Sequence, residues 1–289
     1  MVIALRDLHS DYAGFEQLAT IANALETVVF ETITIDLSGV QWIDANMCSP
    51  LGALLWRAGR NLNAIALANV PGPVETILAR NGFLANYGAA HLPDNYETTI
   101  PYRRFEPRDY RDFCTYVRSY LVGKGLPVMT SALLSKLQES VFEIFGNAAT
   151  HAETLLGIYS CGQFYRSKHR LRFTLTDLGI GFRRNIESRL GLVLSGEQAI
   201  DWAMNLGNTS RVGPVPGGLG LKLLREFITK NGGRLQIASD TGYWELTEGR
   251  SERSQFPCAF PGSVVNIEFN TADTSSYYLS TEIRPEDIF

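Results

Sequence analysis

The sequence predicts an α/β protein built from two domains. Its 289 residues are about twice the length of one typical domain, and 45% of them are hydrophobic against 19% charged, which is ample for packed cores. Short β-branched runs alternate with amphipathic segments, the pattern of sheets covered by helices. A stretch with three prolines and no apolar periodicity, residues 93–109, separates two such regions. We therefore expect a domain at 1–95, a linker at 96–112, a domain at 113–272 and a polar, loosely held tail at 273–289.

The first region alternates strands and helices. Residues 32–37 alternate β-branched and polar side chains, which predicts a strand. Ser49-Pro50 predicts the start of a helix, because proline is tolerated in the first helical turn. Residues 64–68 predict a second strand, and a further helix is expected over 74–81, closed by Gly82.

The second region begins with two expected helices, 109–122 and 130–151, which glycines and a proline separate. Strands are expected at 155–160, 169–176, 234–239 and 263–269, and helices at 197–206 and 219–230. A basic cluster falls between two of these strands, and a solvated hairpin turn accounts for it better than a binding patch. The cluster consists of Arg166, Lys168, His169, Arg170 and Arg172.

Charge and cysteine content narrow the function classes. Residues 1–100 carry 4 Arg, no Lys and 10 acidic residues, a net charge of −6, whereas the remainder carries +2. This balance argues against nucleic-acid binding, which requires a basic face. No apolar run approaches about 18 residues, the first residues lack the basic region of a signal peptide, and the four cysteines are widely spaced. We therefore expect a cytoplasmic protein with no membrane segment, disulfide framework or zinc site.

The helix expected over 130–151 carries a candidate catalytic pair, Glu143 and Asn147, which lie four residues apart on one face. An asparagine oxygen is a hard, neutral ligand for Mg²⁺. A carboxylate one turn away can orient and deprotonate an attacking water or hydroxyl. The solvated face of an amphipathic helix is the simpler alternative for the pair taken alone. The apolar stripe of this helix is Leu133, Leu137, Val141, Ile144 and Ala148.

Two glycine-containing segments supply candidate ligand-binding loops. In the first, the strand over 173–176 ends in Asp177-Leu-Gly179-Ile-Gly181. A carboxylate at a strand end can accept a hydrogen bond from an amine such as the adenine 6-amino group. The glycines let the backbone approach a flat ring or a phosphate. An ordinary strand-to-loop turn is an equal alternative for this segment alone.

The second segment, residues 214–220, has the sequence PVPGGLG and opens a helical segment. Backbone N–H groups at such a helix start attract phosphate through their orientation and the helix dipole. The segment is neither a Walker A loop, because Gly-Lys-Ser/Thr is missing, nor a dinucleotide motif that follows a strand. A flexible loop that caps a core helix is the alternative, and it does not explain so many glycines.

Taken in this order, the three elements resemble the ATP-binding domain of the GHKL superfamily, which groups gyrase-type topoisomerases, a heat-shock chaperone, histidine kinases and mismatch-repair ATPases. Residues 143–152, EIFGNAATHA, resemble its N box, DLGIG at 177–181 its G1 box, and GLGL at 218–221 its G2 box. The segment GSVVNIEF at 262–269 resembles the final strand of that domain. The resemblance covers residues 113–272.

This resemblance implies that the second domain binds ATP with Mg²⁺. Asn147 would bind the metal that bridges the phosphates, Asp177 would hold the adenine amine, and Glu143 would be the general base of any phosphoryl transfer. Residues 207–211 would belong to a mobile lid, and Arg211 or Lys222 would either reach the γ-phosphate or lie on the surface. The other nucleotide-binding residues that it implies are Gly179, Gly181, Gly218, Leu219, Gly220 and Ser263.

The first domain resembles the STAS domain of anti-sigma-factor antagonists. The segments IDLSGVQWID at 35–44 and ALANV at 66–70, each followed by an expected helix, carry this resemblance over residues 1–95. Regulated members of that family carry an Asp-Ser-Ser-Gly turn whose first serine is phosphorylated. The corresponding turn here is Asp44-Ala45-Asn46-Met47, and Ser49 is displaced from the acceptor position. We therefore expect no phosphorylation at this turn.

The two resemblances together imply a signalling protein regulated by nucleotide. The first interpretation is an ATP- and Mg²⁺-binding regulatory protein whose nucleotide state controls the STAS-like domain or a protein partner related to STAS domains or sigma factors. The alternative is a protein serine kinase of the anti-sigma-factor type that acts on a separate STAS-domain substrate. A histidine kinase lacks support because no histidine-centred helix precedes the ATP-binding domain, and intact Glu143, Asn147 and Asp177 argue against a degenerate domain. The sequence leaves open whether ATP is hydrolysed, transferred or only bound, and whether the protein is a homodimer.

Overall fold

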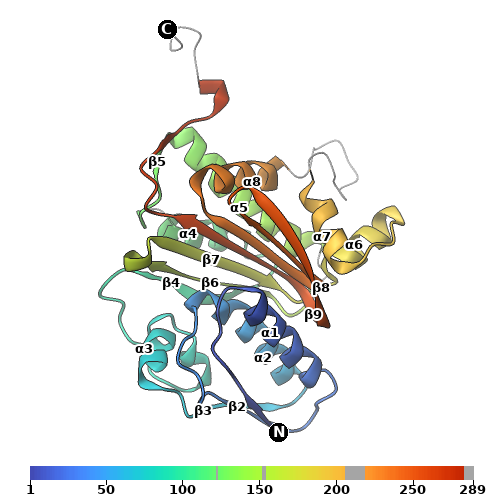
Figure 1. Ribbon diagram of the computed structural model, residues 1–289. Coiled ribbons are helices and arrows are strands. Elements are labelled where there is room, and N and C mark those ends of the chain that lie inside the picture. Colours follow the sequence, from blue (N-terminus) through green and yellow to red (C-terminus); the bar gives the residue numbers. More distant parts are fainter. Residues whose placement is uncertain (122, 152–153, 206–218, 283–289) are drawn as a thin grey trace.

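The computed structural model describes residues 1–121, 123–151, 154–205 and 219–282 (Figure 1). The fold is mixed α/β, as predicted, and its main sheets are a parallel three-stranded sheet and an antiparallel five-stranded sheet. Figure 1 shows the elements in layers, with helices on both sides of the five-stranded sheet and the three-stranded sheet at the N-terminal end of the molecule. We call residues 1–95 the N-terminal module.

The three-stranded sheet belongs to the N-terminal module and runs in the order β1 (Val2–Ala4), β2 (Thr32–Asp36) and β3 (Ala64–Ala68). Strands β2 and β3 confirm the two expected strands. Its helices are α1 (Tyr12–Leu25), α2 (Cys48–Arg60) and α3 (Gly72–Arg80). The sequence analysis missed α1, whose first turn is capped by Asp11 through a 2.9 Å hydrogen bond from the Gly14 N–H. Gly82 follows α3 with a φ of +80°, the left-handed conformation that suits a glycine after a helix.

The five-stranded sheet contains the expected strands of the second region. Its order is β4 (Thr99–Phe105), β6 (Ile158–Tyr165), β7 (Arg170–Asp177), β9 (Arg250–Asn270) and β8 (Arg234–Thr247), and all neighbours pair antiparallel. Strands β8 and β9 extend well beyond the expected ranges. They form a long hairpin whose turn, Glu248-Gly249, has positive φ at both residues.

Residues 99–105 differ from expectation, because they form strand β4 inside the expected linker. The three prolines of this region argued against regular structure. However, β4 is the edge strand, and its pairing with β6 shifts register between Ile100 and Arg103, where Pro101 lies. An edge strand with an irregular register tolerates proline because no inward ladder hydrogen bond is lost.

One face of the five-stranded sheet, here called the helix face, is covered by α4 (Tyr110–Leu121), α5 (Ser131–His151) and α8 (Leu219–Asn231). Both α4 and α5 match the expected helices closely. Phe173 and Leu175 of β7 lie in the core beneath these helices. The predicted apolar stripe of α5 is confirmed, since all five of its side chains are buried there.

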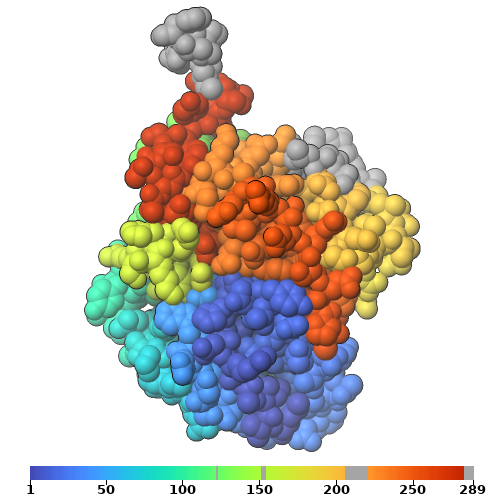
Figure 2. Space-filling view, in the orientation of Figure 1, coloured from blue at the N-terminus to red at the C-terminus, as the bar shows by residue number. Residues whose placement is uncertain are grey.

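The opposite face of the five-stranded sheet, here called the back face, is covered by the N-terminal module. Side chains of α1, α2 and the three-stranded sheet share one apolar core with side chains of the five-stranded sheet. Figure 2 shows the blue N-terminal residues lying directly against the orange residues of the C-terminal half. The two regions that the sequence separates are therefore packed together through a continuous core. The contributions of the five-stranded sheet to it include Tyr159, Ala238, Tyr243, Phe256, Phe260 and Val264.

The remaining elements lie at the ends of the five-stranded sheet. Helices α6 (Gly181–Leu190) and α7 (Gly196–Met204) follow β7 and pack beside β8. The tail was expected to be loosely held, but β10 (Ser276–Tyr277) pairs parallel with β5 (Val128–Met129), and the Tyr277 ring packs 5.1 Å from the Phe227 ring. This attachment depends on one short strand pairing and one aromatic contact within a polar segment, so the composition of the segment does not reveal it. Throughout the described ranges, no helix is both long and apolar enough to cross a membrane.

Candidate functional site

Asp177 is the last residue of β7, and its carboxylate is buried at that end of the sheet. It accepts a 2.9 Å hydrogen bond from the Gly179 N–H. Asp177 pairs with Ser263 of β9, whose hydroxyl also donates to the carboxylate. Side chains alternate along a strand, and Phe173 and Leu175 point to the helix face. Asp177 therefore lies on the helix face, the side that α5 and α8 cover.

Burial dominates the electrostatics of Asp177 and raises the pKa of its carboxyl group to about 7. Hydrogen bonds from Gly179 and Ser263 act in the opposite direction, but they do not compensate for the lost hydration. A buried carboxylate of this kind gains most from a ligand that brings its own hydrogen-bond donor. The site is therefore suited to a polar group with an N–H or O–H, such as an exocyclic amine.

Two glycines with positive φ shape the backbone around Asp177. Gly181 begins α6 with a φ of +72°, and a Cβ there would lie 2.6 Å from the Ser239 Oγ. Gly262 has a φ of +87°, and a Cβ there would lie 2.2 Å from the Asp177 carbonyl oxygen. Both positions therefore require glycine for conformation and for space. The Ser239 hydroxyl donates to the Gly262 carbonyl at 2.7 Å and accepts from the Phe182 N–H at 3.1 Å, which joins the three segments.

The structure thus brings together four of the predicted site residues: Asp177, Gly179, Gly181 and Ser263. Ser239 belongs to the same cluster and was missed by the sequence analysis. It pairs with Ser263 across β8 and β9, and a lone serine in a strand gives no signal of such a role. Pairing the two strands of the β8–β9 hairpin residue by residue would place Ser239 opposite Ser263.

Glu143 and Asn147 lie on α5 and are half-buried. Helix α5 packs beside α8 on the helix face, so the pair and Asp177 are on the same side of the five-stranded sheet. Among the described residues, no atom lies within 4 Å of the position that a Cβ at Gly146 would take. In the described residues, no group of three or more His, Cys, Asp or Glu side chains is arranged to hold a metal ion.

Part of the glycine-rich segment that precedes α8 lies outside the described residues, as do Gly218 and Arg211. Leu219 and Gly220 are the first two residues of α8. Lys222 is half-exposed and forms a 3.9 Å ion pair with Glu226 one turn later. An exposed pair of this kind contributes little to stability and leaves the lysine at the helix surface.

The turn formed by Asp44, Ala45, Asn46 and Met47 is buried against the back face of the five-stranded sheet. Ala45 and Asn46 have no exposed surface, and the Ala45 N–H donates to the Tyr165 hydroxyl at 3.0 Å. The Asn46 amide donates to the Thr174 hydroxyl and to the Asn266 side-chain oxygen, both at 3.0 Å. This turn therefore faces away from the helix face on which Asp177 lies.

Ser49 is also buried at this contact. Its hydroxyl donates to the Tyr159 carbonyl at 3.0 Å and lies 2.8 Å from the Thr176 hydroxyl. Tyr159 and Thr176 are cross-strand partners in β6 and β7. Ser49 therefore binds both strands at the position directly before Asp177.

Arg172 supplies the main charge contact between the N-terminal module and the sheet. Its guanidinium lies 2.5 Å from Asp44 and 2.6 Å from Glu268, and all three side chains are largely buried. Burial is the largest single effect and raises the pKa of Asp44, but the charge of Arg172 together with hydrogen bonds from the Trp42 indole and the Ser10 N–H outweighs it and holds that pKa below its ordinary value. The expected solvated hairpin exists, because residues 166–168 form the turn between β6 and β7, yet Arg172 is not solvated. Its acidic partners are distant in sequence, so composition could not reveal them.

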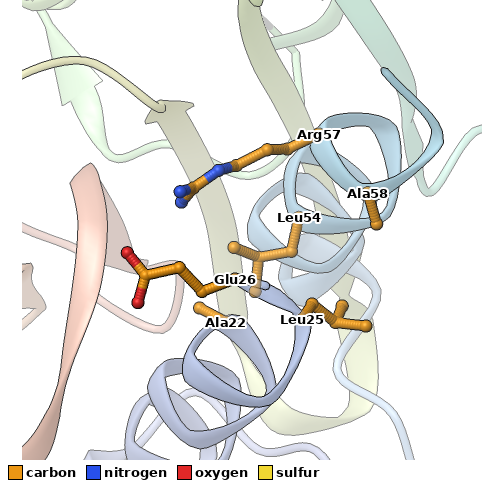
Figure 3. A pocket seen from close by; sticks show the side chains of 6 residues that line it. All are labelled: Ala22, Leu25, Glu26, Leu54, Arg57 and Ala58. Atoms are coloured by element: carbon orange, nitrogen blue, oxygen red, sulfur yellow. The ribbon is translucent and has the colours of Figure 1, made fainter. Parts of the chain in front are cut away.

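A surface pocket lies between the C-terminal ends of α1 and α2 (Figure 3). Figure 3 shows aliphatic side chains at its base, with Glu26 and Arg57 extending beside it. It contains none of the candidate site residues. Its lining consists of Ala22, Leu25, Glu26, Leu54, Arg57 and Ala58.

No protein-family model matches this chain, and no curated protein matches it at a significant level. The strongest arrangement is the buried carboxylate of Asp177 among Gly179, Gly181 and Ser263.

Proposed function

We propose that the protein binds ATP with Mg²⁺ through a GHKL-type site on the helix face and that nucleotide binding regulates the N-terminal module or a protein partner. The single observation that carries this proposal is the buried Asp177 carboxylate, surrounded by Gly179, Gly181 and Ser263. These four residues come from two motifs more than 80 positions apart, and both motifs belong to the same predicted pattern. Their assembly supports the pattern because chance matches have no reason to meet.

The adenine 6-amino group fits the chemistry of this carboxylate. The carboxylate only accepts hydrogen bonds when ionised, and the amine donates two. A flat ring requires backbone without side chains beside it, which Gly179 would provide, whereas glycine at 181 is required by the close approach of the Ser239 hydroxyl. A donated hydrogen bond to a buried charged group contributes about 1.5–3 kcal/mol.

The phosphates and Mg²⁺ would lie between α5 and the start of α8. Asn147 would contribute an oxygen to the metal, and the N-terminal end of α8 would favour the negative charge of the phosphates. Mg²⁺ keeps several waters and needs only one or two protein ligands when phosphates are present. Glu143, one helical turn from Asn147, would hold and deprotonate the attacking hydroxyl where phosphoryl transfer occurs.

The N-terminal module fits a regulatory role better than the role of a substrate in the same chain. Its acceptor-equivalent residue is Ala45, and the turn that contains it is buried against the back face. Phosphoryl transfer requires the acceptor hydroxyl to reach the terminal phosphate. A kinase activity, the alternative proposal, would therefore act on a separate protein.

Calorimetric titration of the full chain with Mg-ATP tests the proposal. Asp177→Asn should weaken binding by about 10- to 150-fold, the loss of one hydrogen bond to a charged group. Asp36→Asn is the matched control, because Asp36 also ends a strand and accepts the backbone N–H two residues later at 3.0 Å. It lies in the N-terminal module and should leave the affinity unchanged. Equal affinities of the wild type and Asp177→Asn would refute the adenine assignment.

A further inference from the structure

Strand β7 contributes side chains to both the back face and the helix face of the five-stranded sheet. Thr174 and Thr176 point to the back face, where they contact Asn46 and Ser49 of the N-terminal module. Asp177 points to the helix face, where the proposed nucleotide site lies. A shift of the end of β7 therefore changes both surfaces together.

The contact at Ser49 lies at the end of β7 that such a shift would move. Its hydroxyl binds the Tyr159 carbonyl of β6 and the Thr176 hydroxyl of β7, one residue before Asp177. Neighbouring strand residues are about 3.3 Å apart. The N-terminal module thus contacts the β7 side chain directly before Asp177 and the backbone of the strand paired with it.

The contact between the N-terminal module and the back face is polar as well as apolar. The Asn46 amide nitrogen lies within 3.0 Å of oxygens from Ser10, Thr174 and Asn266. The Gln236 amide donates to the Ser10 carbonyl, also at 3.0 Å. A buried hydrogen-bond network of this kind fixes one register of packing between the N-terminal module and the back face.

Two cysteines lie on opposite sides of this contact. Cys48 begins α2 and Cys161 lies in β6, and neither has exposed surface. The Asn81 amide lies 3.3 Å from the Cys48 sulfur and 3.6 Å from the Cys161 sulfur. Cys114 is also buried, but it lies on α4, which covers the helix face, away from the N-terminal module. The chain therefore contains native probes both at the contact and away from it.

We propose that nucleotide binding at the Asp177 site and docking of the N-terminal module on the back face are linked, so that ATP tightens docking and docking tightens ATP binding. The linkage runs through the end of β7 and the Ser49 contact, and it rests on the proposed function of the Asp177 site. Such coupling is reciprocal by thermodynamic necessity. Partial release of the N-terminal module would then expose the back face in the nucleotide-free protein.

Thiol labelling of the full-length protein tests this linkage. Iodoacetamide reacts when a cysteine thiolate displaces iodide, and burial both shields Cys161 and raises its pKa. Labelling of Cys48 and Cys161 therefore requires the N-terminal module to open. A saturating non-hydrolysable ATP analogue with Mg²⁺ should slow labelling of these two cysteines about fivefold or more. Labelling of Cys114 should change much less, as peptide mass spectrometry of all sites would report.

The outcomes separate the linkage from the proposed function. Any ligand slows global unfolding, so equal slowing at Cys114 would mean general stabilisation and would overturn the linkage. Nucleotide binding seen by calorimetry without slower labelling of Cys48 and Cys161 would also overturn it and leave the nucleotide site standing. No nucleotide binding to the wild type would overturn both proposals.

A matched pair of variants locates the coupling. Ser49→Ala removes the bond to β7 and should reduce the ATP effect on Cys48 and Cys161 labelling at least twofold, with faster labelling in the absence of nucleotide. Ser140→Ala removes an equally buried serine hydroxyl, which binds the Lys136 carbonyl within α5 at 2.9 Å. This control should retain the wild-type ATP effect. An unchanged ATP effect in Ser49→Ala would show that the coupling does not run through Ser49.

Discussion

Asp177 combines complete burial with a pKa of about 7, and this combination makes stability depend on pH. The unfolded chain loses this proton near pH 3.8, whereas the folded chain keeps it up to about pH 7. Over that window the folded state binds more protons, so the free energy of unfolding falls as pH rises. The stabilisation is complete below about pH 4 and is lost above about pH 7. It amounts to at most about 4 kcal/mol, at about 1.4 kcal/mol per pKa unit.

Asp177→Asn should therefore flatten the decline of unfolding free energy between pH 4.5 and pH 7.5, as urea unfolding at several pH values would report. Asp36→Asn should keep the decline, because hydrogen bonds from Asn69 and Ser38 lower the pKa of Asp36. A carboxylate with a lowered pKa loses its contribution only below this window. An unchanged slope in Asp177→Asn would contradict the assigned burial of its charge.

Glu143 and Asn147 are expected to fail in different ways when substituted. Asn147 would bind Mg²⁺, so Asn147→Ala should weaken Mg-ATP binding itself. Glu143 would bind no part of adenine, so Glu143→Ala should keep the affinity within about tenfold, or roughly 1.4 kcal/mol. It should slow any phosphate release by about 10² or more. The two quantities are measured side by side for each variant, and unchanged turnover in Glu143→Ala would remove its role as a base.

At the scale of elements, periodic sequence patterns predict those helices and strands that one buried face determines. The stripe of α5 and the alternation in β2, β3 and β7 are periodic, and the structure confirms all of these elements. The cluster of Asp177, Gly179, Gly181 and Ser263 was also predictable, because strand ends and glycines carry strong local signals. Strand β4 was missed because its prolines are tolerated only at an edge, which depends on the sheet. The contacts of Ser239 and Ser49 were not predicted because their partners lie 23 to 127 residues away.

Substitution of Gly262 tests whether its close approach to Asp177 fixes the position of the end of β7. A methyl group there would strike the Asp177 carbonyl and force a φ of +87° on an alanine. Gly262→Ala should lower the melting temperature and weaken ATP binding together, because the backbone of Asp177 must move. Gly59→Ala is the control, since a Cβ in this part of α2 would lie 3.9 Å from its nearest neighbour. Alanine inside a helix is favoured over glycine by about 0.5–1 kcal/mol, so this control should be neutral or stabilising.

At the scale of the whole molecule, the arrangement of layers sets what the N-terminal module can do. It shares a continuous apolar core with the five-stranded sheet, although charge and composition suggested two independent domains. A sequence reports which side chains are apolar, but it does not report which two apolar surfaces will pack together. The turn at Ala45 and Asn46 and the Asp177 carboxylate consequently lie on opposite faces of one sheet.

This separation predicts that the protein does not phosphorylate its own N-terminal module. Transfer within one chain would require the acceptor turn to leave the back face and cross to the helix face, breaking the bonds of Asn46 and the ion pair of Asp44 with Arg172. Removing one partner of a buried ion pair such as Asp44–Arg172 costs about 3–5 kcal/mol. Moving the turn to the helix face would break this pair in the same way. After incubation with Mg-ATP, intact mass should show no phosphate, and Ala45→Ser, which places a hydroxyl acceptor in this turn, should show none either. A stoichiometric phosphate within residues 40–50 of either protein would contradict the arrangement and favour the kinase interpretation, with the N-terminal module as its substrate.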